Sequence, residues 1–125
     1  MLNNIRVLII DDEESVRETL RENLEDCGFE VSEAVDGEQG IQLIDEKNPP
    51  HVVITDIIMP RKEGLETIMA IRKKFPAMKL IAISGGGRSK TMDFLDLAEK
   101  LGAHAVLPKP LDLDELEKTV RKLAV

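Results

Sequence analysis

Short apolar runs alternate five times along the chain with stretches in which apolar residues recur every three or four positions. The runs occupy residues 6–10, 30–34, 51–55, 79–83 and 105–108. An apolar run of this length is typical of a β-strand, and the three-and-four spacing is typical of a helix that buries one face. The pattern therefore predicts five strand–helix repeats, and right-handed crossovers between parallel strands would place helices on both faces of one sheet.

Helix boundaries are marked by the residue types that usually begin and end helices. A glycine just after a helix favours the positive φ found there, and an aspartate just before one can accept hydrogen bonds from unpaired backbone N–H groups. Proline ends a helix because it lacks the backbone N–H. The predicted helices run from the first strand to Gly28, from Asp36 to Asn48-Pro-Pro50 with Leu43 facing inward, over about 64–75, over about 91–101 up to Gly102, and from Asp112 onward.

The second and fifth strands have the character of edge strands. Residues 30–34 are partly polar, and Pro108 in the fifth strand lacks the N–H that a central strand needs. Residues 51–55 are almost continuously apolar, as expected of a strand covered on both faces. The flavodoxin-like strand order 2-1-3-4-5 places both of these strands, the second and the fifth, at edges. We therefore predict an α/β fold, a doubly wound parallel sheet of (βα)5 topology, with residues 1–125 forming one domain.

Four of the five strands lead into residues that can bind a metal or a phosphoryl group. Asp11 and Asp12 follow the first strand, Asp56 the third, Ser84 the fourth and Lys109 the fifth. The carboxyl ends of parallel strands lie on one edge of the sheet, so these side chains are expected to converge. Converging carboxylates repel one another, and a hard divalent cation such as Mg²⁺ would offset the repulsion. Together with a hydroxyl and an ammonium group, the set suits phosphoryl transfer.

The composition excludes several other classes of function. The formal net charge of −7 argues against direct nucleic-acid binding, because phosphates attract basic surfaces. The single cysteine allows no internal disulfide, and no apolar run approaches the ~18 residues of a membrane span. The N-terminus lacks the basic-then-apolar layout of a secretory signal. We therefore expect a cytoplasmic protein that does not insert into a membrane.

The polar residues stand in an order and spacing that resemble a known family. The chain resembles the receiver domain of two-component response regulators over essentially its whole length, as in single-domain regulators of the chemotaxis type. One helix follows the fifth strand, so either a regulator of one domain or a receiver cut from a longer protein is expected. The resemblance is carried by Asp11-Asp12, Asp56-Ile-Ile-Met-Pro60, Lys62-Glu63-Gly64, Ser84-Gly85, Gly102-Ala103 and Lys109-Pro110.

The resemblance implies a phosphoacceptor module that switches its conformation. Asp56 would accept a phosphoryl group from the phosphohistidine of a sensor histidine kinase or histidine phosphotransfer protein. Asp11, Asp12, Asp56 and the backbone carbonyl of Ile58 would bind Mg²⁺, for which Mn²⁺ can substitute. The module would transfer phosphoryl groups to and from its own Asp56 only, and would act on a downstream protein rather than on a small substrate.

Two further residues would contact the phosphoryl group in such a domain. Ser84 would donate a hydrogen bond to a phosphoryl oxygen, and Lys109 would pair with its charge. The Lys109-Pro110 bond is also a candidate for cis geometry. The sequence departs from the family at Val106, where an aromatic side chain usually rotates on switching.

A docking face and a control on hydrolysis are also expected. Ser15, Thr19 and Glu22 form an exposed stripe on the first helix, and with the loop of Pro110 and Leu111 they would meet the phosphodonor.

Ile58 and Gly86 would border the path of the water that hydrolyses the aspartyl phosphate. Ile58 offers no group to orient that water and Gly86 has no side chain, so slow self-dephosphorylation is expected.

The alternative is a Mg²⁺-dependent phosphohydrolase that uses an aspartyl nucleophile on a similar sheet. Such hydrolases carry Asp-x-Asp after the first strand, whereas Asp11 and Asp12 are adjacent here. Repeated turnover of a phosphoester would favour the hydrolase, and a single stable phosphoryl group on the protein would favour the receiver.

Overall fold

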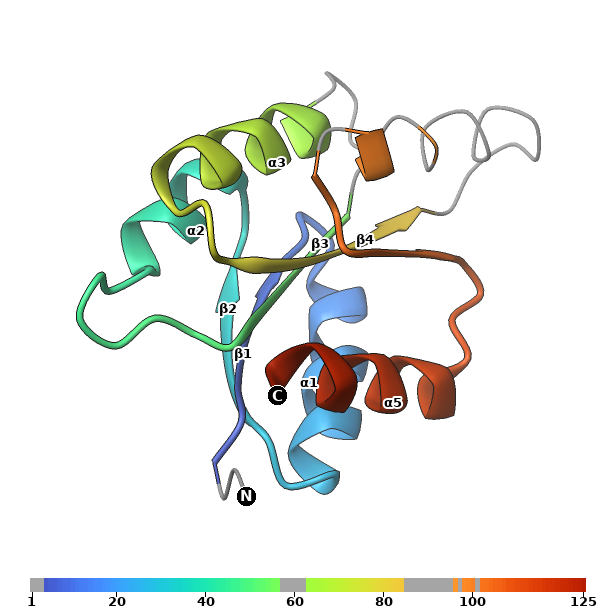
Figure 1. Ribbon diagram of the computed structural model, residues 1–125. Coiled ribbons are helices and arrows are strands. Elements are labelled where there is room, and N and C mark those ends of the chain that lie inside the picture. The colour runs from blue at the N-terminus through green and yellow to red at the C-terminus, as the bar shows by residue number, and fades with distance from the viewer. Residues whose placement is uncertain (1–3, 57–62, 85–95, 97, 101) are drawn as a thin grey trace.

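The computed structural model of the protein describes residues 4–56, 63–84, 96, 98–100 and 102–125. Its centre is a five-stranded parallel sheet in the order β2-β1-β3-β4-β5 (Figure 1). The strands are β1 (Arg6–Ile10), β2 (Glu30–Ala34), β3 (Val52–Asp56), β4 (Lys79–Ser84) and β5 (Ala105–Pro108). The helices include α1 (Glu14–Asp26), α2 (Gly37–Leu43), α3 (Glu63–Lys74) and α5 (Leu113–Ala124), and residues 96 and 98–100 are also helical.

The strand order confirms the predicted flavodoxin-like sheet. β2 and β5 lie at the edges, and every strand begins and ends within one residue of its predicted limits. Ile54 of β3 lies between Ile9 of β1 and Ile81 of β4, and all three are fully buried. Pro108 ends the edge strand β5, where its missing N–H breaks no central ladder.

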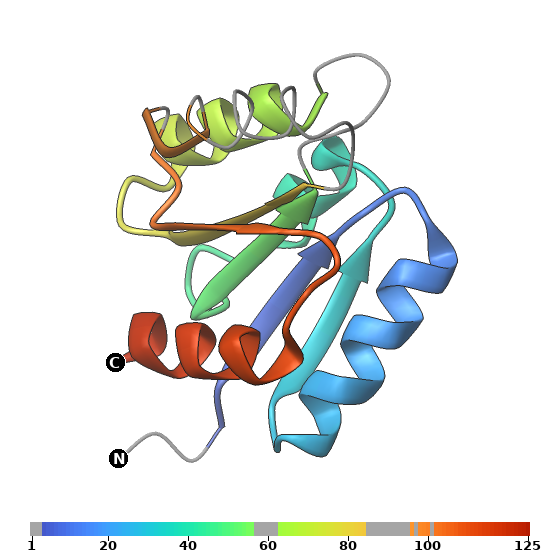
Figure 2. The same ribbon diagram turned by 90° about the vertical axis from the view of Figure 1, so that its right-hand side faces the viewer.

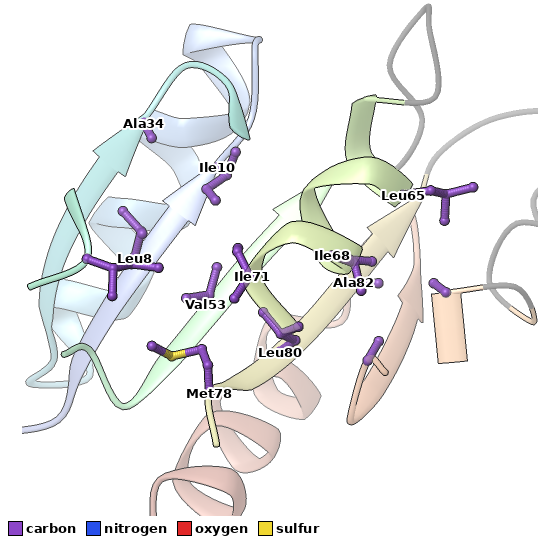
Figure 3. Packing of buried hydrophobic residues seen from close by; sticks show 13 residues of the cluster. Leu8, Ile10, Ala34, Val53, Leu65, Ile68, Ile71, Met78, Leu80 and Ala82 are labelled. Carbon is purple, nitrogen blue, oxygen red and sulfur yellow. The ribbon is translucent and has the colours of Figure 1, made fainter. Parts of the chain in front are cut away.

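The sheet separates two apolar clusters that face opposite sides. α2 and α3 cover one face, and α1 and α5 cover the other (Figure 2). On the first face, Ile68 and Ile71 of α3 pack over the central strands (Figure 3). On the second face, Leu20 and Leu24 of α1 share a cluster with Leu116 of α5. Burial on both faces explains why the central strands are so uniformly apolar.

The predicted helix boundaries are correct at most of the described ends. Asp36 Oδ1 accepts a hydrogen bond from the Gln39 N–H at 2.8 Å, and Asp112 caps α5 in the same way. Gly28 follows the end of α1 with a φ of +94°, and Gly102 has a φ of +121°. Most of the predicted helix over 91–101 lies outside the described residues.

The second helix is shorter than predicted. α2 ends at Leu43, well before the prolines, because Ile44 adopts an extended conformation (φ −79°, ψ 110°) and inserts into the core. Leu43 is 49% exposed, so its predicted inward position is wrong. The chain then turns at Asp45, whose Oδ1 accepts a hydrogen bond from the Lys47 N–H at 2.9 Å.

Candidate functional site

The polar residues at the carboxyl ends of four strands meet at one edge of the sheet. Lys109 Nζ lies 3.2 Å from Asp56 Oδ2 and 3.8 Å from Asp11 Oδ2. The Lys109 backbone N–H donates to the Ser84 carbonyl at 2.7 Å, which ties the end of β5 to the end of β4. The Lys109–Pro110 peptide bond is cis, as anticipated. The structure thus brings together Asp11, Asp56, Ser84 and Lys109, which are distant in sequence.

The members of this cluster differ in their exposure to solvent. Asp11, Asp56 and Ser84 are buried, with 0%, 2% and 0% of their surface exposed. Lys109 is half-buried, with 23% of its side chain exposed. Asp12 is exposed beside them. Among the charged residues expected at this site, solvent therefore reaches Asp12 and Lys109, whereas the carboxylates of Asp11 and Asp56 are buried.

Asp11 has a raised pKa because of its surroundings. Burial raises its pKa to about 6, and the neighbouring Asp56 carboxylate contributes to the increase. The Glu13 N–H, which donates to Asp11 Oδ1 at 2.8 Å, and the Lys109 ammonium group oppose it. Burial is the largest of these effects, and the Glu13 N–H and the Lys109 ammonium group offset it only in part.

Two buried polar atoms in this cluster have no hydrogen-bond partner among the described residues. They are Asp11 Oδ2 and Ser84 Oγ. A buried polar atom without a partner carries a desolvation cost, which a ligand at the site would relieve. A carboxylate oxygen suits Mg²⁺, and a serine hydroxyl suits a phosphoryl oxygen, so the residues fit both groups.

The predicted metal ligands are only partly gathered in the described part of the chain. No three carboxylate, histidine or cysteine side chains there lie close enough to form a complete metal cluster. Asp11 and Asp56 are side by side, while Asp12 stays exposed and the Ile58 carbonyl lies outside the described residues. This remains compatible with Mg²⁺, which commonly takes one or two carboxylates and keeps several waters.

An apolar groove runs beside the acidic cluster, between α1 and the chain that follows β5. It has a volume of about 330 Å³, and four of the five residues predicted for docking line it: Ser15, Thr19, Pro110 and Leu111. Glu22, the fifth, is exposed on α1 but does not line the groove. Val16, Leu20 and Leu113 complete the apolar wall, and Lys109 connects the groove with the cluster.

Some predicted residues lie outside the described part, and one neighbour of the site escaped prediction. Ile58 and Gly86, expected to control hydrolysis, are among the residues that the structure does not describe. Arg17 escaped prediction: its Nη1 donates to the Asp11 carbonyl at 2.8 Å. In the sequence, the only indication of this contact is that an arginine stands next to the apolar stripe of α1.

The response regulator receiver domain family matches residues 7–121. The chain belongs to this family. An NtrX-like response regulator of Rickettsia felis is 38% identical to this receiver domain over 117 residues, which are 92% of this chain and 24% of that protein. Response regulator MprA of Mycobacterium sp. strain KMS is 35% identical over 120 residues, 95% of this chain and 50% of that protein.

Solved structures of receiver domains have the same fold. A response regulator receiver domain protein from Clostridium thermocellum superposes with a TM-score of 0.86 and 32% identity, covering 95% of this chain and 93% of that one. The receiver domain of NtrX from Brucella abortus gives a TM-score of 0.85 and 28% identity, covering 94% and 97%. The resemblance seen in the sequence is therefore confirmed, and the receiver domain spans a quarter to a half of the curated relatives described above.

Membership of the family establishes the general role of the chain. Receiver domains are phosphoacceptor signalling modules of two-component systems; as a class they are served by histidine kinases and bind Mg²⁺ at the phosphorylation site. No described helix in this receiver domain is long and apolar enough to cross a membrane. Val106 is half-buried and packs against the apolar cluster beneath α3.

Proposed function

We propose that this receiver domain accepts a phosphoryl group on Asp56 and that Ser84 and Lys109 hold the transferred group. The observation that carries the proposal is the pairing of a buried Asp56 carboxylate with Lys109 Nζ at 3.2 Å, next to the Ser84 hydroxyl, which has no hydrogen-bond partner among the described residues. A carboxylate, an ammonium and a hydroxyl converging at the carboxyl edge of a parallel sheet suit phosphoryl transfer.

The transfer step uses the Asp56 carboxylate as the nucleophile. One of its oxygens attacks the phosphorus of a phosphohistidine, and the new P–O bond forms as the P–N bond breaks. The leaving imidazole nitrogen keeps the electron pair of the broken bond. Lys109 then pairs with a phosphoryl oxygen, and Ser84 donates a hydrogen bond to another.

Asp11, Asp12, Asp56 and the Ile58 backbone carbonyl would hold Mg²⁺, or Mn²⁺ in its place. The fit is supported by the buried Asp11 Oδ2, which has no hydrogen-bond partner among the described residues. When bound, the cation neutralises negative charge on the phosphoryl group. Without it, the repulsion that helps to raise the pKa of Asp11 would also oppose an incoming phosphoryl group.

The phosphodonor would dock in the groove between α1 and the chain after β5. The groove is lined by Ser15, Thr19, Pro110 and Leu111. Lys109 lines it as well, and because Lys109 contacts Asp56, the groove connects the docking face with the acceptor residue. The donor is a sensor histidine kinase or a histidine phosphotransfer protein. Glu22, exposed on the same helix, would contribute charge at the rim.

Three further properties belong to the proposal. Residues 1–125 act as one domain in the cytoplasm, without direct binding of nucleic acid, and their phosphorylated form acts on a downstream protein. Ile58 and Gly86 leave the attacking water unoriented, so the aspartyl phosphate is lost slowly. Val106 has no ring to rotate, so switching depends on the loops at the carboxyl edge.

The test is the stoichiometry of phosphorylation by acetyl phosphate. We expect one stable phosphoryl group per chain by intact-mass spectrometry, with labelling blocked by a chelator and restored by Mg²⁺ or Mn²⁺. The same protein should not turn over a generic phosphoester. Repeated phosphoester turnover without a stable phosphoprotein would instead support the aspartyl-nucleophile phosphohydrolase.

A further inference from the structure

Arg17 of α1 connects the acidic cluster with the edge strand β2. We infer that Arg17, held by Glu33, is a positioning residue that fixes the main chain of Asp11 and thereby orients the oxygens that meet Mg²⁺. The inference rests on the proposed function, because it concerns the metal ligands named there. It adds a charged pair outside the cluster to the residues on which Mg²⁺ binding depends.

The Arg17 guanidinium makes two contacts in different directions. Nη1 donates to the Asp11 carbonyl at 2.8 Å, and Nε donates to Glu33 Oε1 at 3.1 Å. The Arg17 side chain is 13% exposed and that of Glu33 is 23% exposed, so the pair is better shielded than an ordinary surface ion pair. A planar guanidinium holds its donors at fixed angles and can make both contacts at once.

Asp11 is held at three of its four polar atoms. Its N–H donates to the Ala34 carbonyl at 3.1 Å, its Oδ1 accepts from the Glu13 N–H at 2.8 Å, and its carbonyl accepts from Arg17. The fourth atom, Oδ2, lies 3.8 Å from Lys109 Nζ and has no hydrogen-bond partner in the described structure. Fixing the other three gives Oδ2 a defined direction, and such outer contacts commonly set the affinity of a metal site.

Arg17 also ties the start of α1 to the connection that precedes it. Glu13 occupies the N-cap position, but its side chain makes no capping hydrogen bond. A capping side chain would accept a hydrogen bond from one of the first backbone N–H groups of the helix, which Arg17 cannot do because a guanidinium only donates. Here the tie comes from Arg17, one turn into the helix, which reaches back to the carbonyl of Asp11.

Arg21 provides a matched control on the same helix. Its Nη1 donates to the other oxygen of Glu33, Oε2, at 2.8 Å, and its Nε lies 3.5 Å from Glu25 Oε1. Its side chain is 49% exposed, and its ion-pair partners in the described part of the chain are Glu25 of α1 and Glu33 of β2. Arg17→Lys and Arg21→Lys each remove a guanidinium–Glu33 contact while keeping the charge, but only Arg17→Lys removes a contact to Asp11.

The first measurement is amide hydrogen exchange in the presence of a chelator, followed by NMR. We expect Arg17→Lys to reduce the protection of the Asp11 and Glu13 amides by roughly tenfold, because both lie in the connection that Arg17 holds. Arg21→Lys should leave these two amides unchanged. Glu33→Gln, a second variant, should produce a smaller loss at the same two amides.

The second measurement is Mg²⁺ affinity by calorimetry. Arg17→Lys should weaken binding roughly tenfold, while Arg21→Lys should stay within about twofold of the wild type. At saturating Mg²⁺, Arg17→Lys should recover most of the wild-type rate of labelling by acetyl phosphate. Wild-type exchange or wild-type Mg²⁺ affinity in Arg17→Lys overturns the inference, whereas failure of the wild-type protein to bind Mg²⁺ or take up phosphate overturns the proposed function instead.

Discussion

At the scale of single residues, Asp11 illustrates how a binding site lowers the stability of the protein that contains it. Its carboxylate is fully buried beside Asp56, and its pKa rises from 3.8 to about 6. Between those pH values the folded protein binds more protons than the unfolded chain does. The free energy of unfolding therefore falls as the pH rises through this window.

The first prediction is that Asp11→Asn stabilises the metal-free protein at neutral pH. A pKa shift of this size corresponds to roughly 3 kcal/mol, and we expect a gain of about 1–3 kcal/mol at pH 7.5. The gain should shrink as the pH falls toward 4, where wild-type Asp11 is protonated.

Urea denaturation in a chelator, followed by circular dichroism at both pH values, measures the difference. Burial also lowers the pKa of His51 and His104, but both histidines are present in both proteins and their effect cancels. An equal gain at both pH values would show that the charge of Asp11 is not its cause.

At the scale of elements, α2 can approach α3 closely because its first residue is glycine. A Cβ added at Gly37 would lie 2.9 Å from Thr67 Cβ, closer than carbon atoms pack. Thr67 is itself buried and β-branched, so it has little freedom to move away. Steric fit, rather than helix propensity, therefore determines the residue at this position.

A second prediction follows for Gly37→Ala. Helix propensity alone would make alanine stabilising by about 1 kcal/mol, but the clash with Thr67 should instead destabilise the protein by about 1–3 kcal/mol. Glu38→Ala, at the exposed neighbouring position of the same helix turn, is the control and should change little. A stabilised Gly37→Ala protein in urea denaturation would show that α2 moves away at little cost.

The third prediction concerns the groove between α1 and the chain after β5. Glu22→Lys should slow phosphoryl transfer from a protein donor by roughly fivefold or more, because a rim charge mainly affects the rate of association. Labelling by acetyl phosphate, which needs no docking face, should be unchanged.

Glu30→Lys makes the same charge change at an exposed position on the edge strand β2 and should affect neither donor. Equal slowing of both donors by Glu22→Lys would place the damage in the acceptor site rather than on the docking face.

At the scale of the whole molecule, the topology was predictable because it depends on burial, which hydrophobic spacing records. The end of α2 was not, because Ile44 leaves the helix to fill the core, a tertiary effect without a local signal. The convergence of Asp11, Asp56 and Lys109 could be predicted, because the carboxyl ends of parallel strands lie at one edge of the sheet. The contact between Arg17 and Asp11 could not be foreseen, because it depends on how one side chain folds back over its own helix.

The most direct test of the account is the identity of the residue that carries the phosphoryl group. Intact-mass spectrometry after incubation with acetyl phosphate and Mg²⁺ would compare the wild type with Asp56→Asn and with Asp45→Asn, an exposed control after α2. The amide at position 56 nearly preserves the shape of the side chain and relieves repulsion, so the fold should persist. We expect one phosphoryl group on the wild type and on Asp45→Asn, and none on Asp56→Asn. Undiminished labelling of a folded Asp56→Asn protein would contradict this expectation.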